Sequence, residues 1–423
     1  MKIRSQSAWI CGIAGVVLTG MVGTARADVQ PGDAISKDNM DKAADLVSPG
    51  VKWCIERGLK LKVTAYKKIE WNKVFREATE KYAGQVKLGA DGRSIEGHVA
   101  GLPFPKIDAN DPNIAVKLMW NYEYKPYVTD DGDLRNFDAD TGPLGDGPMG
   151  IERHYLLDHL RTLFYNSRLL VDPKPDLPNP DKVRGKTSLH PILEPFDLKG
   201  VGLTATRYLD PDRQDDTWLY LPTLRRVRRL SSAQRSDALF GQDTDVDSYG
   251  GYAGQIGWFS WKFLGEKSVL GSFHSEKFPV EYCPGSGDFA FCDDWEKRDV
   301  YVIEGVAKQP QYAYGKRVLY IDKETYLISY SDIYDRAGQL WKVWMNQYSF
   351  RKQAPTSGAI DYPDEMPFNP SITMVDMQLR HATRAALPSS KYPGEQGWYF
   401  NQGEKTGLTE EFFTIAHLIE SGH

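Results

Sequence analysis

The sequence predicts a mainly β (α+β) protein built on a large, strongly curved antiparallel sheet. Three observations support this prediction. From Pro195 onward, segments rich in β-branched and aromatic residues follow one another without the strand–helix alternation of parallel-sheet folds. The links at 322–325 and 335–338 contain only a few residues, and such short links force neighbouring strands to be antiparallel. Several strands carry apolar residues on both faces, so we expect both faces of the sheet to be covered.

The predicted helices lie before Pro195. Apolar residues recur at steps of three and four from Trp71 to Tyr82, which indicates an amphipathic helix. A second helix is expected to follow Asp111-Pro112 and to end near Tyr122. The other elements predicted in this region are a β-run at 59–66, a β-hairpin (85–88 and 94–100) around the turn Asp91-Gly92, a helix at 150–168, and a surface loop or lid at 171–191.

The strands predicted after Pro195 carry apolar residues on both faces. In 340–350, Trp341, Val343 and Met345 alternate with a row that includes Trp344. A sheet bent around a helix or a ligand would cover both faces, and a sandwich of two packed sheets is the alternative. The aromatic run 258–264 is a candidate strand, and the other predicted strands are Phe196–Tyr208, Thr217–Leu221, Arg225–Leu230, Asp299–Lys308, Lys316–Ile321, Tyr326–Tyr334, Leu340–Phe350 and Ile372–Thr383.

The first 27 residues have the features of a secretory signal peptide. Lys2 and Arg4 precede an apolar stretch at 8–22, and Ala25-Arg26-Ala27 forms a cleavage site of the A-x-A type. The apolar stretch contains glycines and is short for a bilayer span, although an uncleaved anchor is the alternative. We therefore expect an exported protein cleaved near Ala27, with a single domain over 28–423 that has helical elements at its N-terminal end and a C-terminal helix.

Export changes the interpretation of the cysteines. Cys283 and Cys292 close a turn rich in Pro and Gly, and in an oxidising compartment such a pair predicts a local disulfide. Cys54 is then left as a small buried side chain, and pairing of Cys54 with either of the others is the alternative.

Composition and charge argue against several functions. The formal net charge of −5 gives no basic surface for nucleic acid. The chain has 8 His and 4 Cys but 11 Trp, 23 Tyr and 17 Phe, which disfavours a metal enzyme and favours a β-protein or a binder of an apolar ligand. We expect no cofactor and no metal.

The short motifs do not support catalysis. The motif G-x-G-x-x-G at 145–150 has no predicted strand before it, so it indicates a loop rather than a dinucleotide site. Asp243, Asp245 and Asp247 resemble the start of a calcium loop, but the position of its glutamate is Gly254, which favours an acidic solvated loop. His154 and His159 are five residues apart on the predicted helix and do not share a face as a zinc pair would. No catalytic residue is assigned, and we expect that the protein is not an enzyme.

Two features are candidates for binding. The first is aromatic: rows of large side chains would either pack in the core or line an apolar cavity. The candidate ligand-binding residues are Trp258, Phe259, Trp261, Phe263, Trp341, Val343, Met345, Trp218 and Tyr220. The second is the run of four arginines, Arg225, Arg226, Arg228 and Arg229, which would either protect an exposed strand edge or contact an anionic head group or an acidic partner.

The order of several segments resembles a large proteobacterial family known as domain of unknown function 1329, labelled outer-membrane lipoprotein-sorting-like. The resemblance covers roughly 59–379 and rests on 101–107, 220–229 with the acidic loop after it, 261–265, 316–322 and 333–341. That family is similar to the LolA/LolB superfamily of lipid carriers. The resemblance implies an incompletely closed antiparallel β-barrel with helices covering its concave face, a cavity for acyl chains, and work in the periplasm beside RND-type inner-membrane exporters and outer-membrane proteins.

Together these inferences predict a periplasmic carrier or chaperone that holds a lipid or another hydrophobic molecule in a β-sheet cavity during export between the inner and outer membranes. Two alternatives belong to other classes. A non-catalytic scaffold of an exporter complex would have a filled core. A secreted polysaccharide hydrolase would use the aromatic residues as sugar platforms and would need two carboxylates converging in a cleft.

Overall fold

The computed structural model describes residues 29–231, 234–354, 359–387 and 397–422. The predicted signal peptide and the predicted cleavage site near Ala27 lie outside the described residues. Its α-helices are α1 (Pro49–Glu56), α2 (Lys73–Tyr82), α3 (Ile114–Glu123) and α4 (Ile415–Glu420). Short 3-10 helices lie at Met40–Leu46, Ala83–Gln85, Phe196–Leu198, Pro222–Leu224, Tyr249–Gly251, Ile256–Trp258, Gly285–Gly287, Gly403–Thr406 and Glu410–Phe413.

Strands make up most of the regular secondary structure in the described residues. The first half of the chain contributes β1 (Ala34–Ile35), β2 (Leu61–Thr64), β3 (Lys87–Leu88), β4 (Ile95–Glu96), β5 (Asp131–Pro143), β6 (Arg153–Phe164), β7 (Val183–Leu189), β8 (Ile192–Glu194) and β9 (Gly202–Tyr208). The second half contributes β10 (Asp216–Leu221), β11 (Arg226–Arg229), β12 (Phe259–Gly271), β13 (Asp294–Ala307), β14 (Lys316–Asp322), β15 (Ile328–Tyr334), β16 (Leu340–Arg351), β17 (Met366–Asp376), β18 (His381–Ala386) and β19 (Gly397–Phe400).

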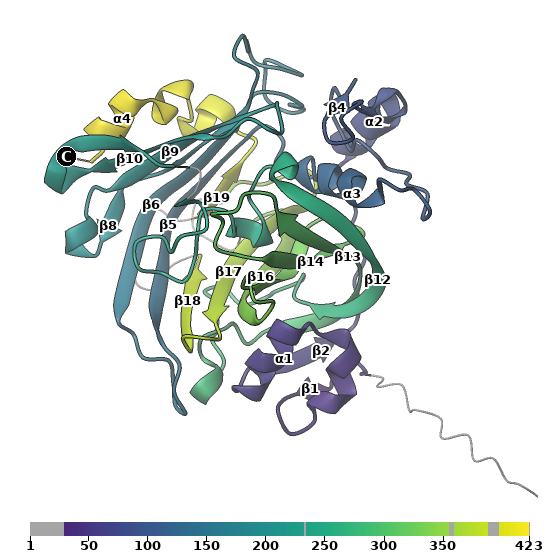
Figure 1. Cartoon of the computed structure of the whole chain (residues 1–423), viewed down its shortest axis with the longest axis vertical. Helices are drawn as coiled ribbons and strands as arrows, with labels where there is room; N and C mark the ends of the chain where they lie inside the picture. The colour runs from purple at the N-terminus through teal and green to yellow at the C-terminus, as the bar shows by residue number, and fades with distance from the viewer. Residues whose placement is uncertain (1–28, 232–233, 355–358, 388–396, 423) are drawn as a thin grey trace, which may run out of the picture.

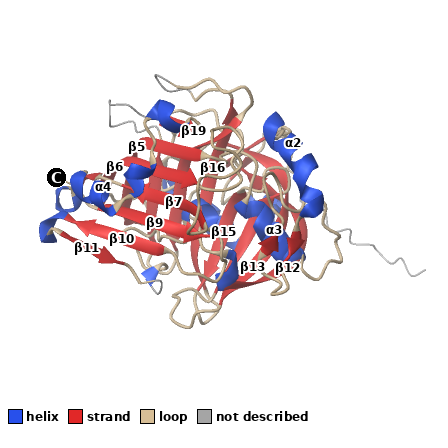
Figure 2. Ribbon diagram, turned by 90° about the horizontal axis from the view of Figure 1, so that it is seen from above, coloured by secondary structure: helices blue, strands red, loops and turns tan. Residues whose placement is uncertain are grey.

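One long antiparallel sheet dominates the molecule. Following the paired neighbours gives the order β11, β10, β9, β7, β6, β5, β18, β17, β16, β15, β14, β13 and β12. The short strands β8 and β19 pair with β6 and β5, and β2 runs parallel to β13. Among the described residues β11 and β12 do not pair with each other, so the sheet curls without closing (Figure 1; Figure 2). The predicted curved, incompletely closed antiparallel sheet is confirmed.

The two faces of the sheet are covered by different elements. On β16, Val343 and Met345 belong to a core cluster that includes Val51 and Ile55 of α1. Trp344 points to the other face, where its cluster includes Leu118 of α3. Figure 1 shows α1 grouped with β1 and β2 at one end, while α3 lies across β12. The expectation that both faces are covered is therefore confirmed on this strand.

Local sequence explains where α1 begins. The Ser48 hydroxyl accepts a hydrogen bond from the Val51 N–H at 3.2 Å, and Pro49 occupies the first helical position. Gly50 is required because a Cβ there would lie 2.5 Å from Asp332 Oδ1 and 2.6 Å from Val343 Cβ. The helix therefore packs its N-terminus directly on β15 and β16.

The helices predicted at 71–82 and after Asp111-Pro112 are confirmed as α2 and α3, and the β-hairpin around Asp91-Gly92 as β3 and β4. The helix predicted at 150–168 is wrong, because this segment is strand β6. Its leucines serve two buried faces of a strand, and this mimics helical spacing. Part of the predicted loop 171–191 is strand β7, and the predicted strand 372–383 is interrupted by a turn between β17 and β18.

The segment before Gly145 was expected to lack a strand, but β5 extends to Pro143. The motif at 145–150 therefore joins two antiparallel strands, β5 and β6, and no helix follows it as dinucleotide binding would require. His154 and His159 lie on β6 rather than on a helix. Their Nδ1 atoms are each 2.8 Å from a carboxylate of β5, Asp140 and Asp133 respectively.

Candidate functional site

A cavity of about 540 Å³ lies against one face of the curved sheet. Its wall comes from β5, β6, β7, β9, β16, β17 and β18, with further residues from the end of α3. Residues 235–254, here called the cover segment, supply much of the remaining lining. The volume falls in the range typical of pockets for one small-molecule ligand.

The strand register explains which side chains reach the cavity. Leu203 and Ala205 on β9 are opposite Leu189 and Thr187 on β7, and all four line the cavity. Alternate residues of a strand point to the same face, so this row continues across the sheet. The apolar residues that continue the wall are Leu157, Leu160, Phe137, Ala385, Ile372 and Trp344.

The cover segment is held to the sheet by the three aspartates Asp243, Asp245 and Asp247. These side chains are buried. Asp243 Oδ2 lies 2.8 Å from His381 Nδ1 and accepts a hydrogen bond from the Thr383 hydroxyl at 2.8 Å, both on β18. The predicted acidic solvated loop is therefore wrong: buried carboxylates need hydrogen-bond donors, and here the sheet supplies them.

The other two aspartates, Asp245 and Asp247, bond to tyrosine and arginine side chains elsewhere in the protein. Asp245 accepts a hydrogen bond from the Tyr314 hydroxyl at 2.7 Å and lies 3.7 Å from the Arg317 guanidinium of β14. Asp247 pairs with Arg235 at 2.6 Å and accepts from the Tyr312 hydroxyl at 2.9 Å. Burial raises the pKa of Asp245, while Arg317 opposes that rise. Hydrogen bonding by Asp243 raises the pKa of His381, which favours the charged imidazolium beside this carboxylate.

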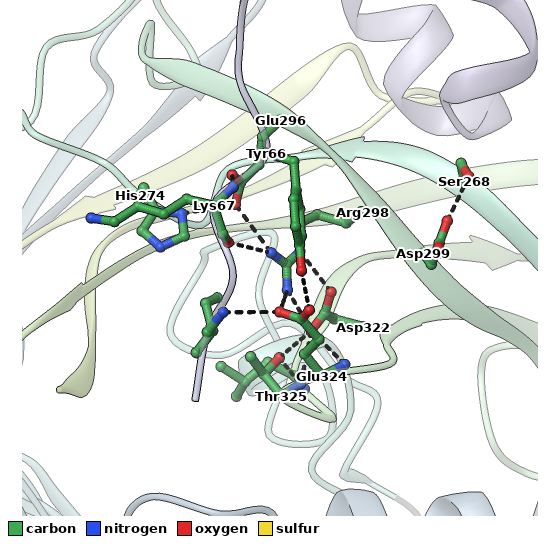
Figure 3. Close-up of polar contacts among 12 residues, drawn as sticks. Tyr66, Lys67, Ser268, His274, Glu296, Arg298, Asp299, Asp322, Glu324 and Thr325 are labelled. Carbon is green, nitrogen blue, oxygen red and sulfur yellow. Dashed lines mark hydrogen bonds and ion pairs between the residues drawn. The ribbon is translucent and has the colours of Figure 1, made fainter. Parts of the chain in front are cut away.

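A second buried network lies away from the cavity and anchors the link between β2 and α2 (Figure 3). Arg298 of β13 donates from Nε to Asp322 at 2.8 Å, from Nη2 to Glu324 at 2.8 Å and from Nη1 to the Lys67 carbonyl at 3.0 Å. Glu324 also accepts from the hydroxyl of Tyr66 and, at 3.0 Å, from the Ile69 N–H. The guanidinium of Arg298 and the carboxylates of Asp322 and Glu324 are bonded within the protein, so the network fixes the chain rather than offering a binding site.

None of the nine aromatic and apolar residues predicted to bind a ligand is among those lining the cavity. Trp258 and Phe259 are buried in the core with Tyr252 and Tyr312, and Trp261 and Phe263 pack beside them. Val343 and Met345 face α1, and the Trp341 ring packs edge-on to the Tyr314 ring. Tyr220 is buried against Gly422, and the Trp218 ring lies under the Arg229 guanidinium. Ligand contact by these nine residues stays a prediction.

Many of the residues that do line the cavity lie on β5 to β9, and of these strands the sequence predicted only β9 as a strand. One signal for them was present: Leu203 and Ala205 alternate within the predicted strand 196–208. On β6, the helix prediction concealed the equivalent row at Leu160 and Thr162. Trp344, which alternates with the chosen row on β16, does reach the cavity.

The four predicted arginines lie at and after the tip of the β10–β11 hairpin, and all are exposed. Arg229 pairs with Asp216 on β10. Within the described chain, Arg225, Arg226 and Arg228 have no carboxylate within 4.0 Å. Arg226 and Arg228 are opposite Leu221 and Leu219 of β10, so these two arginines lie on β11, the strand at the open edge of the sheet. Their role as a docking surface stays a prediction.

Cys283 and Cys292 lie side by side, although both are free thiols in the structure. The strands around them are bridged at Tyr282 and Phe291. A hydrogen bond between the two thiols, together with burial, raises the pKa of Cys283, while the same hydrogen bond lowers the pKa of Cys292 against the opposing effect of burial. The disulfide stays a prediction, and Cys54 is a separate buried thiol.

Among the described residues, no group of three or more His, Cys, Asp or Glu side chains is arranged to hold a metal ion. In the same part of the chain, no helix is long and apolar enough to cross a membrane.

Several known proteins are similar to this chain. An uncharacterized protein of Pseudomonas aeruginosa is 25% identical over 375 residues, which is 83% of this chain and 78% of the relative. A putative outer membrane lipoprotein-sorting protein domain from Vibrio parahaemolyticus has a TM-score of 0.48 at 19% identity and covers 72% of this chain and 98% of its own. A LolA superfamily protein of Nitrosomonas europaea has a TM-score of 0.37 at 15% identity and covers 68% of this chain and 92% of its own.

The family model described as protein of unknown function (DUF1329) matches residues 34–418. This match spans nearly all of the chain between the signal-peptide region and the C-terminal residues, and it confirms the membership predicted from the sequence segments. The chain belongs to the DUF1329 family.

Proposed function

We propose that this protein binds a lipid or another hydrophobic molecule in the cavity under the cover segment and carries it through the periplasm. The observation that supports this most strongly is the cavity itself, because its volume of about 540 Å³ adjoins rows of leucine, alanine and aromatic side chains. A protein that served only as a scaffold would gain nothing from leaving such a volume unfilled, since protein interiors are normally close-packed.

Burial of apolar surface is sufficient to hold such a ligand without covalent chemistry. Each buried methylene contributes about 0.8 kcal/mol, so a chain of several methylenes supplies several kcal/mol. The proposal therefore requires no catalytic residue.

Partners and compartment form the finer part of the proposal. The sequence of the first 27 residues supports export, with cleavage near Ala27. The resemblance to lipid carriers supports a role between an RND-type inner-membrane exporter and an outer-membrane protein. The exposed arginines Arg225, Arg226 and Arg228 are suited to contact an acidic surface on such a partner, since Arg favours carboxylates.

The test is native mass spectrometry of protein purified from the periplasm, followed by solvent extraction of bound molecules. We expect an additional mass that disappears on extraction and yields an apolar compound. Ala205→Phe should reduce the occupied fraction because the added ring projects into the cavity. Ala337→Phe, the same substitution in the exposed turn between β15 and β16, is the matched control.

A clean unliganded mass from several preparations, together with no uptake of a fluorescent fatty-acid probe, would contradict the proposal. That result would favour the scaffold. Equal ligand occupancy in the wild type and Ala205→Phe would place the ligand elsewhere.

A further inference from the structure

The cavity wall changes character along the strands. At one end, Leu160, Leu189 and Leu203 of three neighbouring strands are opposite one another. At the other end, Arg184 of β7 and Arg207 of β9 line the wall. The two arginines lie close together because Arg207 is opposite Gly185, the residue that follows Arg184. A ligand lying along the strands therefore has an apolar neighbourhood at one end and a charged one at the other.

Most charges at this end are already paired. Arg207 and Arg235 lie 2.8 and 3.0 Å from Asp215. Burial alone would raise the pKa of Asp215, but the two guanidinium groups outweigh it and lower the pKa. Asp247 holds the other side of Arg235.

Arg184 and Lys125 complete the charged end. Arg184 Nε donates to Glu123 at 2.9 Å, which neutralises that pair. Among the described residues at this end, with Asp247 included, four cationic side chains face three carboxylates, and Lys125 is the cation without a carboxylate partner.

Lys125 lines the cavity just after α3 and is partly buried. Its Nζ donates to the Tyr122 carbonyl at 3.2 Å and lies 4.3 Å from the centre of the Tyr122 ring. In the described chain no carboxylate oxygen lies within 4.0 Å of Nζ, so donors of the ammonium group remain available. Burial lowers the pKa of Lys125 to about 8, with Arg184 adding to this and Glu123 opposing it. The group is thus largely charged at neutral pH and gains free energy from a bound anion.

We propose that the cavity selects amphiphiles with an anionic head group, which binds Lys125, while the apolar chain extends along β6, β7 and β9 toward Leu160, Leu189 and Leu203. This inference rests on the proposed function and adds the chemical class and the orientation of the ligand.

The experiment compares two probes with the same chain, hexadecanoate and hexadecan-1-ol, by titration of the full-length mature protein at pH 7. The wild type should bind the acid at least about tenfold more tightly, the typical gain from a hydrogen bond to a charged group. Lys125→Met should lose this preference while binding the alcohol as the wild type does. Lys125→Arg, which keeps the charge, should retain the preference, and Lys37→Met is a control at an exposed lysine.

The outcomes separate the two proposals. If neither probe binds the wild type, the proposed function fails and the inference with it. If both bind the wild type equally, or if Lys125→Met keeps the preference for the acid, the anionic head-group site is refuted while the carrier function stands. Tighter binding of hexadecyl phosphate than of hexadecanoate, lost in the same variant, supports the site and identifies its ligand as a phosphate amphiphile rather than a fatty acid.

Discussion

Asp245→Asn removes one charge from the cover segment without changing the size of the side chain. Asp245 and Arg317 are both fully buried, with 3.7 Å between the carboxylate and the guanidinium. The asparagine oxygen can still accept the hydrogen bond from Tyr314, so the losses are the charge that balances Arg317 and the hydrogen bond from the Asp247 N–H to Oδ1. Among the described residues, no other carboxylate lies within 4.0 Å of that guanidinium.

Leaving a buried charge without its partner typically costs about 3–5 kcal/mol. We expect about 3 kcal/mol, the lower end of this range, because 3.7 Å exceeds hydrogen-bond distance and the Ser248 and Tyr312 hydroxyls remain bonded to Arg317. Since Asp245 belongs to the cover segment, the variant should also release a bound ligand faster.

The assay is urea-induced unfolding followed by tryptophan fluorescence. Asp237→Asn, at an exposed carboxylate within the same segment, is the control and should change the free energy of unfolding by less than about 0.5 kcal/mol. The double variant Asp245→Asn/Arg317→Met should lose less than the sum of the single losses, because it removes both charges. A single variant Asp245→Asn as stable as the wild type would refute the view that this ion pair anchors the cover segment.

Three further predictions follow from the site and the sheet. Burial raises the pKa of Asp332 to about 7, so the stability that its protonated form contributes is present below about pH 4 and is lost as the pH rises through 7. In urea unfolding, the free energy of unfolding of Asp332→Asn should equal that of the wild type at pH 4 and exceed it by up to about 4 kcal/mol at pH 8. The exposed Asp361→Asn should show no such difference. Replacing Arg225, Arg226 and Arg228 by serine should reduce cross-linking to a membrane partner in cells severalfold and leave ligand affinity unchanged; loss of ligand affinity instead would show that these arginines belong to the cavity. Fatty acids of increasing length should bind about fourfold more tightly per added methylene until the chain fills the cavity, and a flat titration series would exclude burial of the chain.

The predictable part of this structure was local. The strands after Pro195 and the helices α2 and α3 follow from the spacing of nearby residues and from short links. The strand β6 could not be distinguished from a helix, because Leu156, Leu157, Leu160 and Leu163 are needed on two buried faces.

The candidate site depended on partners far apart in the sequence. Asp243 is buried only because His381, 138 residues away, lies beside it. Likewise, Asp133 and Asp140 suit a buried strand because His159 and His154 of β6 face them. From sequence alone, acidic residues are expected to be exposed to solvent. The partners that allow them to be buried become known only once the fold is known.

The pairing of β5 with β18 has a consequence for how the protein reaches its native state. Thr141 and Thr383 share a hydrogen bond across 242 residues of chain. If the chain emerges from the membrane with its N-terminus first, β5 to β9 appear long before β16 to β18. The leucines of the future cavity are then exposed to water, with no second half of the wall to meet them. Non-local strand pairing is slow, and exposed apolar strands associate with one another. During the interval between the appearance of β5 to β9 and that of β16 to β18, which the topology imposes, the chain therefore depends on a chaperone or a ligand to cover those strands.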